Sequence, residues 1–243
     1  MFEPFYKYAA PQQFYLTAGR LLPWLAALML LLLLGGLYGG LIFAPTHYEQ
    51  GEGYRIIYVH VPSAWMSMFV YMVMAGASAT ALIWRIKVAE VVASASAPLG
   101  ASFTLLALVT GSLWGKPMWG TYWVWDARLT SELLLLFLYL GFMALEAAID
   151  DKRQAARSCA VLALVGVVNI PIIHYSVEWW STLHQGPTIS KFGERPMHPH
   201  MAIPLLTMAV AFNLYYVVVL LMRVRNLLLE RESGASWVRE MES

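Results

Sequence analysis

The sequence predicts an all-α integral membrane protein with six transmembrane helices and both termini in the cytoplasm. Hydrophobic residues make up 59% of its 243 residues and charged residues only 13%, about half the charged share of an average soluble domain. Six apolar segments are each long enough for a helix that crosses a bilayer, which needs roughly 20 residues. Lysine and arginine are concentrated on one side of these segments, as is typical of membrane spans.

The six apolar segments follow one another along the whole chain. We predict spans at residues 24–43, 63–84, 91–113, 130–149, 158–176 and 202–222. They form a single six-helix membrane domain over residues 1–243, in which 223–243 is a charged cytoplasmic tail. The first segment is too long for the core of a signal peptide, and Pro45 would sit badly after a cleavage site at Ala44. We therefore expect a retained anchor.

The positive charges orient the spans. Eleven of the 16 Lys and Arg residues lie in the N-terminal arm, the second and fourth loops and the tail. Only five lie in the first, third and fifth loops, although these loops, at about 44–62, 114–129 and 177–201, are longer. Positive residues stay on the cytoplasmic side, so the longer loops face outward, which in a bacterium is the periplasmic side of the inner membrane. Function is expected in these outer loops.

Charge and cysteine content exclude several classes of protein. A net charge of +1 gives no reason to expect a nucleic-acid partner. The single cysteine, Cys159, lies inside an apolar segment, and the sequence contains no CxxC pair. Thiol–disulfide chemistry and thiolate metal clusters are therefore excluded.

The second outer loop is rich in aromatic rings. Residues 114–128 read WGKPMWGTYWVWDAR, and five of the first twelve are aromatic, against 14% in the whole chain. Two glycines and Pro117 interrupt the segment, which predicts a loop at the membrane surface between the third and fourth spans rather than an apolar helix. Interfacial anchoring explains a single tryptophan, but it explains this density less well. The tryptophans are Trp114, Trp119, Trp123 and Trp125, and Asp126 and Arg128 close the loop.

Histidines lie in both outer loops that flank the tryptophan-rich one. His60 comes two residues before Pro62, which suits the first turn of the second span. His184 lies four residues after Trp180, close to the end of the fifth span. Chemistry alone gives these two no advantage over the other outer histidines, which are more often solvated or hydrogen-bonded than metal ligands; these are His47, His198 and His200.

The fifth span contains a histidine, and the fourth contains a glutamate close to its outer end. The fifth span holds Asn169, Pro171 and His174, and we expect Pro171 to kink it. We interpret His174 as a buried, hydrogen-bonded core histidine. Glu132 lies just inside the fourth span, where a carboxylate is costly and usually faces protein or water.

A histidine, a tryptophan-rich platform and a second histidine favour a large flat apolar ligand with a metal at its centre. Haem has this form, and neutral imidazole is a common axial ligand of its iron, here from His60 and His184. The two haem propionates need cations, and the sequence does not choose among Arg55, Lys116, Arg128 and Lys191. A guanidinium suits a carboxylate geometrically, so Arg55 and Arg128 enter the predicted site.

Three segments resemble a known family. Residues 119–126, WGTYWVWD, fit the pattern WGxxWxWD, which resembles the signature loop of haem-handling proteins in cytochrome c assembly. The resemblance to one family, heme exporter protein C of the bacterial cytochrome c maturation system, extends over nearly the whole chain in span number, loop order and loop length. It is carried by YVHVPSAWM at 58–66, WGKPMWGTYWVWDARLTSEL at 114–133 and NIPIIHYSVEWWSTLHQG at 169–186.

This resemblance implies a site and a set of partners. Haem b would be held transiently and non-covalently at the periplasmic surface, with axial ligands that match His60 and His184. It would be delivered to a membrane-anchored periplasmic haem chaperone, cytochrome c maturation protein E, whose own histidine becomes bonded to a haem vinyl group. The single-span cytochrome c maturation protein D and the ABC transporter subunits A and B would assist. The motif positions match Trp114, Trp119, Trp123, Trp125 and Asp126.

The role expected from these residues is to hold and orient haem. The sequence offers no acid–base pair, so we do not expect an enzyme. A haem-containing quinol oxidoreductase subunit would carry facing histidines inside its spans, and only His174 is so placed. A haem permease would need a cytoplasmic haem site, yet the inner loops contain no histidine. A structural subunit whose aromatic loop docks a partner predicts no bound haem.

Overall fold

The computed structural model describes residues 10–180 and 197–242, and within these ranges the chain forms helices and no strand. Six helical stretches are long and apolar enough to cross a membrane, as the sequence predicts. The elements are α2 (Pro11–Tyr38), η1 (Gly39–Phe43), η2 (Glu52–Ile56), α3 (Ile57–Trp84), α4 (Lys87–Trp119), α5 (Ala127–Ala148), α6 (Lys152–Gly166), α7 (Asn169–Trp179), α8 (Pro199–Arg231) and α9 (Ser236–Glu242).

The helices extend beyond the predicted spans at both ends of the bundle. α4 runs for 33 residues, Lys87–Trp119, where the apolar pattern marks only 91–113. Counting apolar residues finds the part of a helix that matches the hydrocarbon layer, whereas backbone hydrogen bonding continues into the polar interface. The helices therefore bring interfacial residues onto rigid backbone.

The fifth span is broken where the sequence predicts a kink. α6 ends at Gly166 and α7 begins at Asn169. Pro171 has no N–H, so the Val167 carbonyl four residues earlier cannot accept its usual helical bond. It instead accepts the Ile170 N–H at 2.9 Å, a tighter bond of the 3₁₀ type that keeps the carbonyl satisfied.

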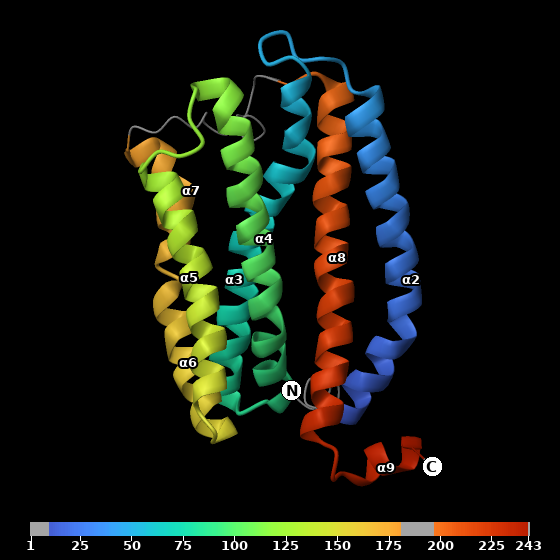
Figure 1. Ribbon diagram of the computed structural model, residues 1–243. Coiled ribbons are helices and arrows are strands. Elements are labelled where there is room, and N and C mark those ends of the chain that lie inside the picture. The colour runs from blue at the N-terminus through green and yellow to red at the C-terminus, as the bar shows by residue number, and fades with distance from the viewer. Residues whose placement is uncertain (1–9, 181–196, 243) are drawn as a thin grey trace.

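The helices form an upright bundle with two distinct ends (Figure 1). α3 and α4 pack against each other in the middle, α5, α6 and α7 lie on one side, and α8 and α2 lie on the other. The start of α3, the end of α4 and the start of α8 lie together at one end, which we call the site end. The start of α2 and the short α9 lie at the opposite end. The first and last described helices therefore begin and end on the same side, as an even number of spans requires.

Small residues let the central helices approach closely. A side chain at Gly100 of α4 would come within 2.0 Å of the Tyr139 ring of α5, and one at Gly166 of α6 would meet the Tyr71 hydroxyl at 2.0 Å. Both tyrosines are fully buried. Close packing over small residues is the usual way in which helices associate in lipid, where no hydrophobic driving force acts between them.

Candidate functional site

The tryptophan-rich segment is partly helical, which differs from the predicted loop. α4 continues through Trp114 and Pro117 to Trp119, and Gly120 ends it with a positive φ of 78°. Pro117 removes one backbone hydrogen bond, but only two helical residues follow it, so the helix persists. The irregular part is short, and α5 begins after Asp126, whose Oδ1 accepts the Leu129 N–H at 2.8 Å.

His60 lies in the first turns of α3, as predicted, and α4 fixes its ring. The Thr110 hydroxyl donates to the Leu106 carbonyl at 2.6 Å, so its oxygen accepts from His60 Nδ1 at 3.0 Å. With the proton on Nδ1, the lone pair is on Nε2, which is the form of imidazole that binds a metal. The ring also lies so close to Gly111 that a Cβ there would be 2.9 Å from His60 Cε1.

Aromatic rings connect His60 to the first loop. The Trp114 ring lies edge-on to His60 at 5.6 Å and to Tyr54 at 6.2 Å. Tyr54 in turn stacks on His47 at 4.3 Å. Trp114 Nε1 donates to Gln50 Oε1 at 3.1 Å. The indole is therefore fixed by a hydrogen bond as well as by its ring contacts. Trp114 is therefore an ordered wall beside His60.

His47 has a structural role in this loop. Its Nδ1 accepts the backbone N–H groups of Glu49 and Gln50, both at 3.2 Å, and its backbone pairs with Gly51. A hydrogen-bonded histidine is one of the ordinary interpretations of an outer-loop histidine. The turn that it closes places Gln50 against Trp114, a link that the sequence does not reveal.

Each candidate cation in the described residues has a protein partner. Arg55 pairs with Glu52 and donates from Nη1 to the Gly40 carbonyl at 2.8 Å. Arg128 donates to the Ile173 carbonyl of α7 at 3.3 Å. Lys116 donates to the Gly120 carbonyl at 3.0 Å and lies over the Tyr122 ring. A guanidinium has five N–H donors, so both arginines keep donors for a carboxylate.

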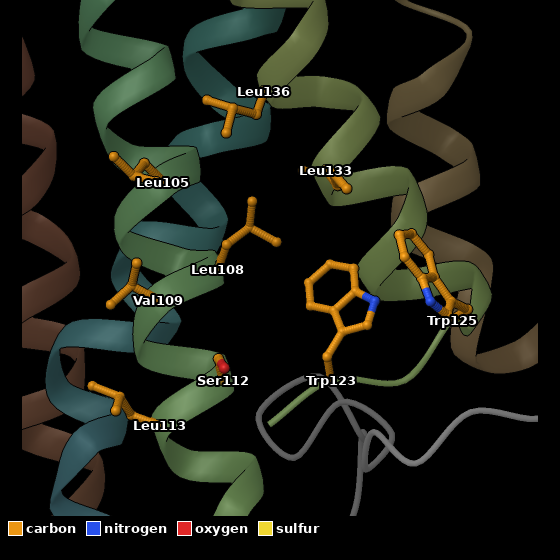
Figure 2. Close-up of a pocket in the computed structure, with 9 residues that line it drawn as sticks. All are labelled: Leu105, Leu108, Val109, Ser112, Leu113, Trp123, Trp125, Leu133 and Leu136. Atoms are coloured by element: carbon orange, nitrogen blue, oxygen red, sulfur yellow. The ribbon is translucent and has the colours of Figure 1, made fainter. Parts of the chain in front are cut away.

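An apolar pocket of about 530 Å³ lies between α4 and α5, with two tryptophans of the motif in its lining (Figure 2). Trp123 and Trp125 meet edge to face at 5.3 Å and close one end of the pocket. The buried Trp123 Nε1 has no hydrogen-bond partner among the described residues, so it is a donor that a bound ligand would satisfy. The other lining residues are Leu105, Leu108, Val109, Ser112, Leu113, Leu133 and Leu136.

The residues beside His60 and the residues of the pocket lie on two different faces of α4. At 3.6 residues per turn, Thr110, Gly111 and Trp114 share the face that meets His60. Leu108 and Ser112 line the pocket on a different face. The sequence predicts one platform, whereas the structure places Trp114 beside His60 and places Trp123 and Trp125 in the lining of the pocket. Trp119 lies against Gly115 at the end of α4.

Comparison with known proteins decides the family. A family model described as heme exporter protein C matches residues 4–239. The chain belongs to the heme exporter protein C family. The curated heme exporter protein C of Escherichia coli is 51% identical to it over 241 residues, which cover 99% of this chain and 97% of the relative. That of Bradyrhizobium diazoefficiens is 53% identical over 223 residues, which cover 92% and 84%. A protein of Marchantia polymorpha named as a putative cytochrome c biosynthesis ccmC-like mitochondrial protein is 44% identical over 193 residues, which cover 79% and 82%.

The remaining histidines of this chain differ in their surroundings. His184 lies outside the described residues, as does Lys191. His198 caps α8, its Nδ1 accepting the His200 N–H at 3.3 Å, and the two exposed rings stack. Within residues 10–180 and 197–242, no three His, Cys, Asp or Glu residues could hold a metal ion together.

The interpretation of His174 as a buried core residue is wrong. Its side chain is exposed on α7 and its ring lies edge-on to the neighbouring Tyr175 at 4.7 Å. The break before Asn169 turns α7 so that Ile173 and Ser176 face the core instead. Hydropathy places a residue in a span but does not say which face of the helix it occupies.

Proposed function

We propose that this protein binds haem at the site end of the bundle and delivers it to a periplasmic haem chaperone during cytochrome c biogenesis. Its family membership supports the general part of this proposal, a role in haem handling for cytochrome c maturation. The observation that supports the more specific proposal is the placement of the His60 ring, whose Nδ1 lies 3.0 Å from the Thr110 hydroxyl and whose edge meets the Trp114 ring. The site end faces the periplasm in the predicted orientation.

Two histidines ligate the iron in this proposal, His60 from α3 and His184 from the loop after α7. This coordination needs a second imidazole besides that of His60, and α7, which precedes His184 in the chain, ends at the site end of the bundle. Two strong axial ligands occupy both free positions of the iron, which prevents reaction with oxygen. The haem is haem b, bound non-covalently and transiently.

The tryptophans contact the apolar part of the haem, and the arginines bind its propionates. Trp114 stands beside the iron ligand, and Trp119, Trp123 and Trp125 supply apolar surface at the end of α4 and over the pocket. Arg55 and Arg128 offer their remaining N–H donors to the propionates. Asp126 keeps the aromatic turn attached to α5 through its cap. The protein thus orients haem, and the bond-forming histidine belongs to the chaperone, cytochrome c maturation protein E.

The other proposed partners follow from the same family assignment. The single-span cytochrome c maturation protein D and the ABC transporter subunits A and B would assemble with this chain in the bacterial inner membrane. A loaded chaperone would leave when the transporter acts.

The test measures haem bound per protein after purification from cells with ample haem supply. We expect near-stoichiometric haem in the wild type and a loss of at least tenfold in His60→Ala and in His184→Ala. His200→Ala is the matched control, because this exposed histidine lies at the same end of the bundle and has no proposed role as an iron ligand. Equal loss in all three variants, or a wild type without haem, would remove the proposal and favour a docking subunit.

A further inference from the structure

The apolar pocket between α4 and α5 opens on the outside of the bundle. Leu105, Val109 and Leu113 of α4 line it and are 53%, 48% and 57% exposed, whereas Leu108 forms a buried part of its wall. The lining parts of α4 and α5 belong to stretches that are long and apolar enough to span a membrane. An exposed apolar surface in such a stretch contacts acyl chains when the protein is in a bilayer. The pocket is therefore open to lipid.

The pocket is elongated along the two helices. In Figure 2, Ser112, Leu113 and Trp123 lie at one end of it, and Leu105 and Leu136 lie at the other. From Leu105 to Leu113 an α-helix rises about 12 Å, and the hydrocarbon layer of one leaflet is about 15 Å thick, half of the bilayer core. Leu113 ends the apolar segment from which we predict the third span. The pocket thus extends from the edge of the hydrocarbon layer toward its middle, as an acyl chain does.

The end of the pocket near the aromatic turn holds its polar groups. Trp123 Nε1 is buried and has no hydrogen-bond partner among the described residues, although a buried N–H usually has one. The Ser112 side chain lies at the same end. A phospholipid carries its ester carbonyls between the headgroup and the acyl chains, at the depth where tryptophans gather in membranes. Such a carbonyl is an acceptor for the Trp123 N–H where the pocket begins.

Other apolar occupants fit this pocket less well. A helix of a partner protein is about 10–12 Å across with its side chains, and α4 and α5 pack directly against each other, so such a helix covers the pocket without entering it. The backbone carbonyls of that helix are also already hydrogen-bonded within it. Haem bound to His60 would approach a different face of α4, the one that carries Gly111 and Trp114.

We propose that the pocket binds one phospholipid from the leaflet at the site end, with an acyl chain between α4 and α5 and an ester carbonyl that accepts the Trp123 N–H. Binding of the lipid does not depend on the proposed function. Its consequence for haem does, because the acyl chain would support Trp123 and Trp125 from the pocket side. Trp125 is 77% exposed, so it keeps surface for haem when the pocket is filled.

The experiment measures binding of dioleoyl phosphatidylethanolamine to the delipidated, haem-free, full-length protein in detergent, by native mass spectrometry. A second titration uses the diether analogue of this lipid, which lacks the ester carbonyls. Trp123→Phe keeps an apolar ring but removes the N–H, and Leu108→Trp fills the pocket from its buried wall. The matched controls are Trp179→Phe and Leu134→Trp, because these residues are 56% and 49% exposed and do not line the pocket.

The two lipids isolate the hydrogen bond from the apolar contacts. We expect the wild type to bind the diester about fivefold more tightly than the diether, the effect of one hydrogen bond, and Trp123→Phe to bind both equally. Leu108→Trp should bind both at least tenfold more weakly, and the two controls should equal the wild type. Equal binding of the two lipids by the wild type would overturn the role of Trp123, which tests the proposal even if Leu108→Trp does not fold. Equal binding by Leu108→Trp and Leu134→Trp would overturn the lipid site.

The occupant in the membrane is identified by a photoreactive benzoylphenylalanine in place of Val109. Irradiation of intact cells should give an adduct of the full-length protein whose added mass is that of a phospholipid. An adduct with another protein, or with another segment of this chain, would overturn the proposal and assign the pocket to that occupant.

Haem retention separates this inference from the proposed function. Adding the diester lipid back to delipidated protein should raise haem retention several-fold, and the diether should raise it less. Lipid binding without any change in haem retention would reject the support of the two tryptophans and leave the lipid site intact. A protein that binds the lipid but never binds haem would reject the proposed function alone.

Discussion

At the scale of single residues, the candidate ligand depends on neighbours that are distant in sequence. Thr110 lies 50 positions from His60, yet it fixes the ring through Nδ1. The sequence predicts His60 because it lies close to a helix start. It cannot predict Thr110, Gly111 or Gln50, because no local pattern says which residues of one span meet a histidine on another.

Thr110→Val tests the orientation of the imidazole. Valine keeps the shape but removes the acceptor of the Nδ1 proton, which should lower the basicity of His60 and weaken haem retention roughly tenfold. Thr110→Ser should restore most of it. Thr104→Val is the control, because within the described residues the buried Thr104 hydroxyl bonds only to the Gly100 carbonyl of its own helix, at 2.8 Å. Equal haem content in Thr110→Val and Thr104→Val would show that this hydrogen bond has no role.

Gly111→Ala tests the close approach of His60 to α4. An added Cβ would be 2.9 Å from His60 Cε1, so the ring must move, although alanine favours the helix by about 1 kcal/mol. We therefore expect less haem without a loss of thermal stability. Gly76→Ala on α3, which meets nothing within 4 Å, should leave the haem content unchanged. Full haem occupancy in Gly111→Ala would mean that the ring position is not critical.

At the scale of elements, the helix ends decide how the aromatic residues are presented. The six spans can be predicted because long apolar runs have few alternatives. The extent of α4 cannot, because Pro117 and the glycines are typical of a loop but are also tolerated in the last turns of a helix. This is why the sequence predicts one tryptophan loop, whereas Trp114 lies on a helix face beside His60.

Asp126→Ala tests the cap that joins the aromatic turn to α5. Loss of an N-cap acceptor costs about 1 kcal/mol and should fray the turn that carries Trp123 and Trp125, with a several-fold loss of haem. Asp151→Ala is a matched control, because Asp151 caps α6 in the same way, accepting the Gln154 N–H at 2.7 Å. Both variants should lose similar thermal stability, measured by unfolding in detergent. A similar loss of haem in both would make the effect one of general stability.

At the scale of the whole molecule, the bundle separates its two ends by the length of the spans. Charged side chains join α4, α5 and α8 at the end opposite the site. Arg231 lies 3.8 Å from Glu90 and 3.4 Å from Glu146, and Lys87 pairs with Glu232 at 2.8 Å. The positive-inside rule predicts that this end faces the cytoplasm.

Single cysteines at the two ends test that orientation. In a Cys159→Ser background, a maleimide that cannot cross membranes should label Tyr48→Cys in cells whose outer membrane is permeabilised. Tyr48 is 88% exposed in the first loop. Ser236→Cys, at the start of α9, should react only after the inner membrane is opened. The reverse pattern would invert the protein and place the proposed haem site in the cytoplasm.

The central claim, ligation of haem iron by His60, is tested most directly by the visible spectrum of purified His60→Gly with and without added imidazole. We expect six-coordinate low-spin haem in the wild type, five-coordinate or lost haem in the variant, and recovery of the wild-type spectrum when imidazole fills the space left by the side chain. A variant whose spectrum equals that of the wild type without imidazole would contradict the claim and move the iron to other ligands.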